Sequence, residues 1–147
     1  MTMAEPLPTE DVAQLAALHA RCFPKPWSEN DLRAMLAVPG TVALMIPGAA
    51  MCIARAVEGE GEIMTIGVVP GQREKGLGKT LLAAALSALE EMGASETFLE
   101  VGVENHAAER LYRGAGFEQV GYRADYYARE GGRREDARVM RRKYYKK

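Results

Sequence analysis

The chain has 147 residues, a net charge of −1 at pH 7 and 48% hydrophobic residues. A chain of this length can bury a core without disulfides or metals, so we expect one domain over residues 1–147. Its near-zero net charge argues against a polyanion as the main partner, because such binding depends on a basic surface. We therefore expect no direct nucleic-acid binding.

The cysteines and the first residues bear on the compartment. Cys22 and Cys52 have neither C-x-x-C spacing nor a nearby histidine pair, which favours free or buried thiols in a reducing compartment. Residues 1–11 are acidic and lack a basic start and an apolar core, and no apolar run approaches the length of a membrane span. We expect a soluble cytoplasmic protein without membrane contact.

The first half of the chain predicts two helices followed by two strands. Thr9 can cap a helix that places apolar residues on one face, at Val12, Leu15, Leu18 and Cys22. Ser28 and Asp31 resemble a capping box, and they begin a helix that carries Leu32, Met35 and Leu36. Strands follow over residues 41–46 and 51–57, joined by a tight turn at Pro47-Gly48.

The second half alternates strands with helices. A strand over residues 62–69 leads into a glycine-rich turn and a long helix that ends at Gly93, with leucines at Leu77, Leu81, Leu82, Leu86 and Leu89. The remaining elements are a strand over 97–101, a helix over 105–113 closed by Gly114, and strands over 117–123 and 135–143. This order predicts a mixed α/β fold on one sheet.

Charge is distributed unevenly along the chain. Glutamates at positions 58, 60 and 62 form an acidic stretch. Basic residues gather near the C-terminus, at Arg133, Arg134, Arg138, Arg141, Arg142, Lys143, Lys146 and Lys147. These basic residues favour a solvated edge strand with a frayed end, and the alternative is a docking patch for an RNA-containing substrate particle.

The most informative stretch is the sequence GQREKGLGKT at residues 71–80. A glycine-rich turn from a strand into a helix exposes unpaired backbone N–H groups at the positive end of the helix dipole, where phosphate oxygens bind. A Walker A loop would need glycine at position 73, which is arginine. The alternative to a phosphate site is an ordinary turn with glycines for tight packing.

A second set of residues surrounds the strand at 97–101. Glu100 points to the opposite face from Leu99 and Val101, because side chains alternate along a strand. A carboxylate in an apolar strand must reach water, a cation or a site. Taken alone, Glu100 is typical of an edge residue or an ion-pair partner, and Tyr112 is typical of core packing with a satisfied hydroxyl.

Together these motifs resemble the GNAT superfamily of N-acetyltransferases. Arg73-x-x-Gly76-x-Gly78 matches the family's pyrophosphate loop, Q/R-x-x-G-x-G/A. The pattern Asn105-x-x-Ala108-x-x-Leu111-Tyr112-x-x-x-Gly116-Phe117 matches the signature that follows the family's second cofactor strand. The resemblance implies a mixed central sheet with splayed cofactor-binding strands flanked by helices.

The resemblance also implies roles for individual residues. Glu100 would be the proton acceptor and Tyr112 the proton donor, with acetyl-CoA as cosubstrate and no metal. Acetyl-CoA would contact Ile66, Gly67, Val68, Arg73, Glu74, Lys75, Gly76, Leu77, Gly78, Lys79 and Asn105. His19 and His106 lie far apart in the sequence and have no partner cluster that would suggest a metal site.

Within the superfamily the chain resembles the RimI branch, which acetylates the N-terminal alanine of a small-subunit ribosomal protein. The matching segments are Pro26-Trp27-Ser28-Glu29, Leu99-Glu100-Val101, Tyr126-Tyr127 and Glu135-Asp136-Ala137. The resemblance implies a protein N-terminus as the substrate, with Trp27, Tyr126 and Tyr127 in contact with it. The chain departs from the pattern at Gly67, at Val69 and in a longer, more basic stretch over 129–134.

The implied reaction is direct transfer to a neutral amine. An α-amino group has a pKa near 8 and a lysine near 10.4, so roughly a hundredfold more of a chain terminus is neutral at pH 7. Glu100, through a water, would take the ammonium proton and Tyr112 would protonate the departing sulfur. The alternatives are a GNAT enzyme for a small amine, a non-catalytic acyl-CoA sensor, and an acyl-carrying Cys52, beside which the sequence suggests no base.

Overall fold

The computed structural model describes residues 6–128 and 134–144, without the side chains of residues 7, 127 and 128. The strands are β1 (Leu7–Pro8), β2 (Thr41–Ile46), β3 (Ala50–Val57), β4 (Glu60–Val68), β5 (Glu96–Gly102), β6 (Glu118–Ala128) and β7 (Arg134–Lys143). The helices are α1 (Val12–Cys22), α2 (Glu29–Leu36), α3 (Leu77–Glu91) and α4 (His106–Gly114), with a 3-10 turn η1 (Pro70–Gln72). None of the described helices is long and apolar enough to cross a membrane.

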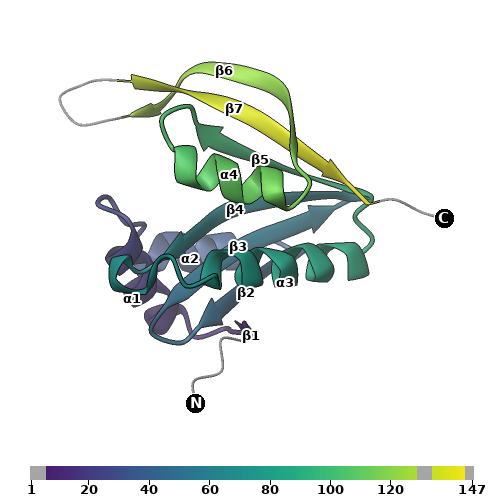
Figure 1. Cartoon of the computed structure of the whole chain (residues 1–147). Helices are drawn as coiled ribbons and strands as arrows, with labels where there is room; N and C mark the ends of the chain where they lie inside the picture. Colours follow the sequence, from purple (N-terminus) through teal and green to yellow (C-terminus); the bar gives the residue numbers. More distant parts are fainter. Residues whose placement is uncertain (1–5, 129–133, 145–147) are drawn as a thin grey trace.

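The described strands form one mixed sheet in the order β1-β2-β3-β4-β5-β7-β6 (Figure 1). Its neighbouring strands are antiparallel except for β4 and β5, which are parallel. The helix α3 connects β4 to β5, as expected for a parallel pair that needs a crossover. The expectation of a mixed α/β fold on one sheet is confirmed.

Hydrophobic clusters cover both faces of the sheet. Leu44 and Ile46 of β2 pack with the leucines of α3 in one cluster. Ala43 and Met45, which alternate with them, pack with α1 and α2 in the other. Figure 1 shows α3 in front of the sheet and α2 behind it. Helices thus pack on both faces of the β2–β4 part of the sheet.

The strands β4 and β5 pair only over their first residues and then separate. The register joins Glu60–Glu62 to Glu96–Phe98 and ends there. Beyond it, β4 carries a bulge at Met64, because Ile53 pairs with Thr65 while the next residue, Ala54, pairs with Ile63. β5 instead stays paired with β7 along its whole length. The expected splayed strands are therefore present.

The ends of two helices differ from the sequence-based expectation. Asp11 rather than Thr9 caps α1, since the Asp11 carboxylate accepts a hydrogen bond from the Gln14 N–H at 3.0 Å. Thr9 continues the β1 pairing through its own N–H, which donates to the Ala43 carbonyl. The helix α4 includes Gly114, and the left-handed residue that ends the turn is Gly116, with φ +96°. The Ser28 capping box of α2 is confirmed.

The C-terminal basic strand is not an edge strand. β7 lies between β5 and β6, because it returns antiparallel to both, and β6 forms the edge. Arg138 forms an ion pair with Glu109 at 3.3 Å, and Arg141 one with Glu96 at 3.9 Å. The edge-strand interpretation of these arginines is therefore wrong. Arg133, Lys146 and Lys147 lie outside the described residues.

Gly61 lies in the short parallel pairing of β4 with β5, and a substitution at Gly61 tests how closely the two strands pack there. A Cβ on Gly61 would lie 2.6 Å from Thr97 Oγ1 and 3.1 Å from Leu89 Cδ1, so Gly61→Ala must displace buried side chains. We expect urea denaturation to show a loss of roughly 1–3 kcal/mol in the free energy of unfolding, which is typical of overpacking.

Gly114→Ala is the matched control for this variant. A Cβ on Gly114 meets no atom within 4 Å, and alanine has the higher helix propensity. Gly114→Ala should therefore lose no stability. Wild-type stability of Gly61→Ala would contradict the close approach of the two strands.

Candidate active site

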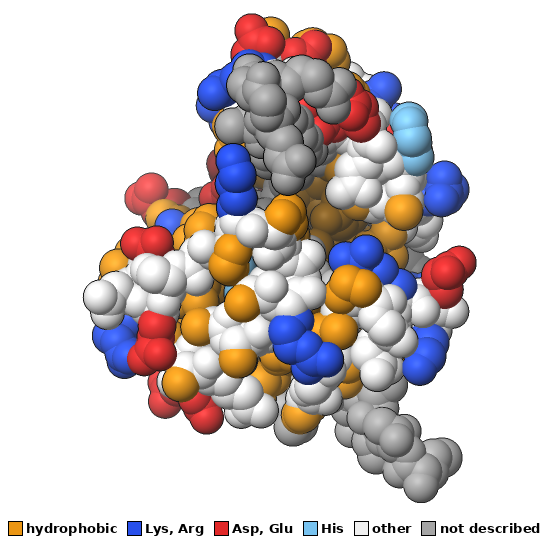
Figure 2. All heavy atoms as spheres, turned by 90° about the vertical axis from the view of Figure 1, so that its left-hand side faces the viewer, with side chains coloured by type: hydrophobic (Ala, Val, Ile, Leu, Met, Phe, Trp, Pro, Cys, Tyr) orange, Lys and Arg blue, Asp and Glu red, His pale blue; other side chains and the backbone are white. Residues whose placement is uncertain are grey.

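A cleft of about 350 Å³ opens where β4 and β5 separate. Its walls are residues 63–66 of β4 and 99–102 of β5, together with Asn105 and Tyr112. On the α1 side it is lined by His19, Phe23, Lys25 and Trp27. Figure 2, which faces this end of the molecule, shows a hollow with hydrophobic side chains at its bottom. The shape of the sheet therefore creates the cleft.

Glu100 lies on β5 in this cleft and is held by two donors from β6. One carboxylate oxygen accepts from Arg123 Nη1 at 2.6 Å, and the other accepts from the Tyr126 hydroxyl at 2.9 Å. The Arg123 guanidinium also lies 4.1 Å from the centre of the Tyr126 ring. The Glu100 side chain is 19% exposed. Its carboxylate is thus oriented by partners and still accessible from the cleft.

A second carboxylate lies close to Glu100. Glu62 pairs with Phe98 across the parallel strands, so the Glu62, Phe98 and Glu100 side chains share one face of the sheet. Burial and the charge of Glu100 raise the pKa of Glu62, and Arg55 acts in the opposite direction. Burial and the hydrogen bond to Glu100 likewise raise the pKa of the Tyr126 hydroxyl. The ion pair of Arg123 with Glu100 and the charge of Arg55 near Glu62 offset the charge of the two carboxylates.

Tyr112 reaches the cleft from α4. It is 6% exposed and belongs to the core cluster on the α3 side of the sheet. Its ring meets the Phe117 ring edge-on, with 5.9 Å between the ring centres. Tyr112 is therefore both a core residue and a wall of the cleft, and its role as the proton donor stays a prediction.

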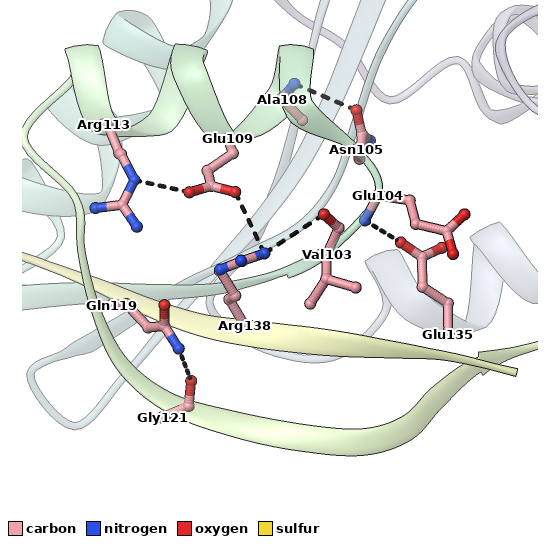
Figure 3. A network of polar contacts seen from close by, with 10 residues as sticks. All are labelled: Val103, Glu104, Asn105, Ala108, Glu109, Arg113, Gln119, Gly121, Glu135 and Arg138. Atoms are coloured by element: carbon pink, nitrogen blue, oxygen red, sulfur yellow. Dashed lines mark hydrogen bonds and ion pairs between the residues drawn. The ribbon is translucent and has the colours of Figure 1, made fainter.

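The start of α4 is fixed by side chains from β7 (Figure 3). The buried carboxylate of Glu135 accepts from the Glu104 N–H at 2.6 Å. Arg138 bonds to Glu109 and donates to the Val103 carbonyl at 3.5 Å. Asn105 caps the helix by accepting from the Ala108 N–H at 3.2 Å. These contacts hold the β5–α4 turn, and with it Asn105 and Tyr112, beside the cleft.

The glycine-rich turn also presents backbone donors. Gly76, with φ +79°, precedes the first residue of α3 and has no side chain with which to cap it. The N–H groups of residues 77–79 consequently lack acceptors within the helix. Arg73 Nε donates to the Val68 carbonyl at 3.0 Å, and Lys75 Nζ donates to the Gln72 side chain at 3.2 Å. Both cations brace the turn.

Gly67 has a packing role that the sequence did not reveal. A Cβ there would lie 2.8 Å from Cys22 Cβ and 2.9 Å from Phe23 Cε2. Only glycine therefore lets the end of α1 approach β4 this closely. This contact brings the segment with Phe23 and Trp27 against the cleft.

The structure brings several of the predicted site residues together and leaves others apart. Ile66, Glu100, Asn105, Tyr112 and Trp27 line one cleft. Tyr126 joins them through its hydrogen bond to Glu100. Lys79 lines a different hollow of about 460 Å³ between α3 and α4. The Tyr127 side chain lies outside the described part of the chain.

Sequence reasoning missed His19, which lines the cleft, and Arg123, which holds the Glu100 carboxylate. His19 was considered only as a metal ligand, although it lies on the apolar face of α1, four residues after Leu15. A histidine at a position of the apolar face of a helix is expected to be buried, and a buried imidazole needs a hydrogen-bond partner. Arg123 carried no such signal, because its contact with Glu100 depends on how β6 folds over the sheet.

The chain matches the acetyltransferase (GNAT) family over residues 12–117. It is 32% identical to the ribosomal protein bS18-alanine N-acetyltransferase of Escherichia coli strain K12, over 95% of this chain and 96% of that protein. The crystal structure of the ribosomal-protein-S18-alanine N-acetyltransferase from Escherichia coli is similar with a TM-score of 0.83 at 31% identity, covering 94% of this chain and 92% of that one.

A Bacillus subtilis acetyltransferase in complex with CoA has the same fold, with a TM-score of 0.77 at 18% identity over 96% of this chain and 99% of that chain. The family match covers most of the chain, and the Escherichia coli relative is similar over nearly its whole length. The chain therefore belongs to the acetyltransferase (GNAT) family, whose members use acetyl-CoA.

Proposed function

We propose that this protein, as one acetyltransferase domain over residues 1–147, acetylates the α-amine of a protein N-terminus. The cleft that brings Glu100, Tyr112 and Trp27 together carries the proposal. The Escherichia coli relative acts, by its name, on the alanine of ribosomal protein bS18. We infer the same class of substrate here, a small-subunit ribosomal protein that begins with alanine, modified in the cytoplasm.

Acetyl-CoA fits the arrangement around β4 and α3. The unpaired N–H groups at the start of α3 and the positive end of its dipole suit the pyrophosphate. A Cβ on Gly78 would lie 3.4 Å from Leu111 Cδ2, an ordinary van der Waals distance, so packing against α4 does not by itself require glycine there. From this end the pantetheine arm would run along residues 66–68 toward Glu100, with Asn105 on the opposite wall. We assign the cofactor contacts to these residues and to the 73–79 turn.

The transfer removes two protons from the α-ammonium and supplies one to the sulfur, so one proton is released overall. The α-ammonium first loses a proton, which Glu100 accepts through a water, and the neutral amine attacks the thioester carbonyl. A backbone N–H of β4 polarises that carbonyl as the C–N bond forms and the C–S bond breaks. Tyr112 then donates its proton to the departing thiolate, and the second proton lost by the attacking nitrogen as the amide forms restores the Tyr112 hydroxyl. Proton transfers of this kind contribute on the order of 10²-fold or more each.

The contacts of Glu100 suit an acceptor that must stay in place. Arg123 and Tyr126 donate to its two oxygens and fix its orientation beside the cleft. Glu62 lies on the same face of the sheet and offers further acceptor oxygens to an ammonium group. Both features favour a substrate that arrives as a cation and reacts as a neutral amine.

A covalent acyl-enzyme on Cys52 is disfavoured. Cys52 is 1% exposed and belongs to the core cluster under α3. Burial raises the pKa of its thiol to about 12, so the nucleophilic thiolate is scarce at neutral pH. Direct transfer between acetyl-CoA and the amine remains the mechanism that the site supports.

Two other functions on the same fold would not need all of these residues. A non-catalytic acyl-CoA sensor would need neither Glu100 nor Tyr112 in the cleft. An enzyme for a small free amine would need no aromatic wall such as Trp27 or Tyr126, which suits the start of a peptide chain. Glu100 and Tyr112 therefore favour an enzyme over a sensor, and Trp27 and Tyr126 favour a protein N-terminus over a small amine.

A peptide panel tests the proposed function. A peptide that begins with alanine and continues with basic residues should be acetylated by acetyl-CoA on its α-amine, as resolved by mass spectrometry. The same peptide with a blocked α-amine and a free lysine should react at least tenfold more slowly, because far less of a lysine is neutral at pH 7. Equal rates on the two peptides, or activity confined to free amino acids and polyamines, would overturn the proposal.

Tyr112→Phe separates chemistry from packing. The variant keeps the buried ring and removes the proton donor, so kcat should fall by about 10²-fold while the Kd for CoA stays within twofold. Tyr144→Phe is the matched control, because it removes a hydroxyl that bonds to Thr97 and the Leu86 carbonyl, outside the cleft. Steady-state kinetics measure kcat, and calorimetry measures the Kd for CoA. If Tyr112→Phe kept the wild-type kcat, as Tyr144→Phe should, Tyr112 would be a packing residue and not the proton donor.

A further inference from the structure

A buried histidine lies on the α1 side of the cleft, and the mechanism above does not use it. His19 is 3% exposed, and its Nδ1 accepts a hydrogen bond from the Trp27 backbone N–H at 3.2 Å. Its ring stacks on the Trp27 ring, with 4.8 Å between centres and 20° between planes. The Phe23 ring also contacts the His19 ring, with 4.5 Å between the ring centres. All three residues line the cleft that contains Glu100.

The hydrogen bond determines which form of His19 can hold Trp27. A neutral imidazole accepts at one nitrogen and donates at the other, whereas an imidazolium donates at both. His19 accepts from the Trp27 N–H, so its own proton lies on Nε2. Protonation of His19 would place a proton on Nδ1 opposite the Trp27 N–H, and two donors facing each other would break this hydrogen bond. Burial lowers the pKa of His19, which keeps the ring neutral at neutral pH.

We propose that His19 is a positioning residue that ties Trp27 back to α1 and so sets the wall against which the first residue of the substrate lies. The proposal rests on the proposed function, because it assigns a role within the same peptide site. Residues 23–28 join α1 to α2, and the bond from Trp27 fixes this segment just before the Ser28 cap. The substrate side of the cleft thereby has a defined shape before a peptide arrives.

The position of Trp27 should depend on pH, because protonation of His19 breaks its hydrogen bond to the Trp27 N–H. Among the described residues, Lys25, on the same segment as Trp27, and Glu100, on β5, are the other charged residues that line this cleft. Arg21 of α1 donates to the Gly48 carbonyl instead. A peptide that requires the ordered Trp27 binds the form with neutral His19. By linkage, bound peptide must then raise the acid dissociation constant of His19 by the same factor by which protonation weakens peptide binding, which lowers its pKa.

The wild-type protein reports this linkage directly, because Trp27 is its only tryptophan. A charged imidazole quenches an indole stacked on it, so Trp27 fluorescence follows the protonation of His19. We expect a transition with a midpoint below pH 6.5. A saturating tryptophan-free peptide that begins with alanine should move the midpoint down by about 0.5–1 unit, a three- to tenfold effect on affinity. A midpoint that peptide does not move would overturn the proposal.

Two variants separate the acceptor from the ring. His19→Asn keeps an acceptor at the position of Nδ1 and cannot titrate, whereas His19→Phe keeps the stacked ring and has no acceptor. We expect His19→Phe to raise the KM for peptide about tenfold, with kcat and the Kd for CoA within twofold. His19→Asn should restore most of the wild-type KM and abolish the rise in KM at acid pH. Equal KM values for both variants, or an acid rise that persists in His19→Asn, would contradict the role of the acceptor.

Thermal melting and CoA binding establish whether each variant is folded. If a variant does not fold, the fluorescence titration of the wild-type protein still tests the proposal. A wild-type protein that acetylates no peptide α-amine would overturn the proposed function itself. Normal α-amine acetylation with a midpoint unmoved by peptide would overturn the role of His19 alone.

Discussion

The short parallel pairing between β4 and β5 is the constraint on which the site depends. Pairing ends at Glu62 and Phe98, because a bulge at Met64 turns β4 away while β5 stays paired with β7. A longer pairing would close the sheet and fill the cleft with backbone hydrogen bonds. The clusters on both faces of the sheet hold β4, and β7 holds β5, so the gap is a fixed feature.

The proposed chemistry is assembled from three parts of the chain around this gap. β5 supplies Glu100, and β6 supplies the donors that orient it. α4 supplies Tyr112, in a place fixed by Glu135 and Arg138 of β7. The α1 side supplies Trp27, held by His19. The supporting residues are as important as the reacting groups, since a positioned acid or base must stay within hydrogen-bond reach of its proton.

What the sequence predicted was local in origin. The Ser28 capping box, the leucine face of α3 and the glycine-rich turn depend on neighbours within a few residues, and all are present. What it missed depends on long-range pairing. The place of β7 inside the sheet, and the reach of Arg123 to Glu100, follow from how β6 and β7 fold back across β5. The apolar stripe of α1 indicated that His19 is buried, but its partner, the Trp27 N–H, is a backbone group that no sequence pattern marks.

The most direct test joins the two proposed ligands in one molecule. CoA linked through an acetyl bridge to the α-amine of an alanine-first peptide should bind at least about 10²-fold tighter than CoA alone, because the second contact becomes intramolecular. The same peptide linked through a lysine side chain, with its α-amine blocked, should bind no tighter than CoA. Calorimetry that gave the two conjugates equal affinity would contradict a site that accepts acetyl-CoA and a protein N-terminus together between β4 and β5.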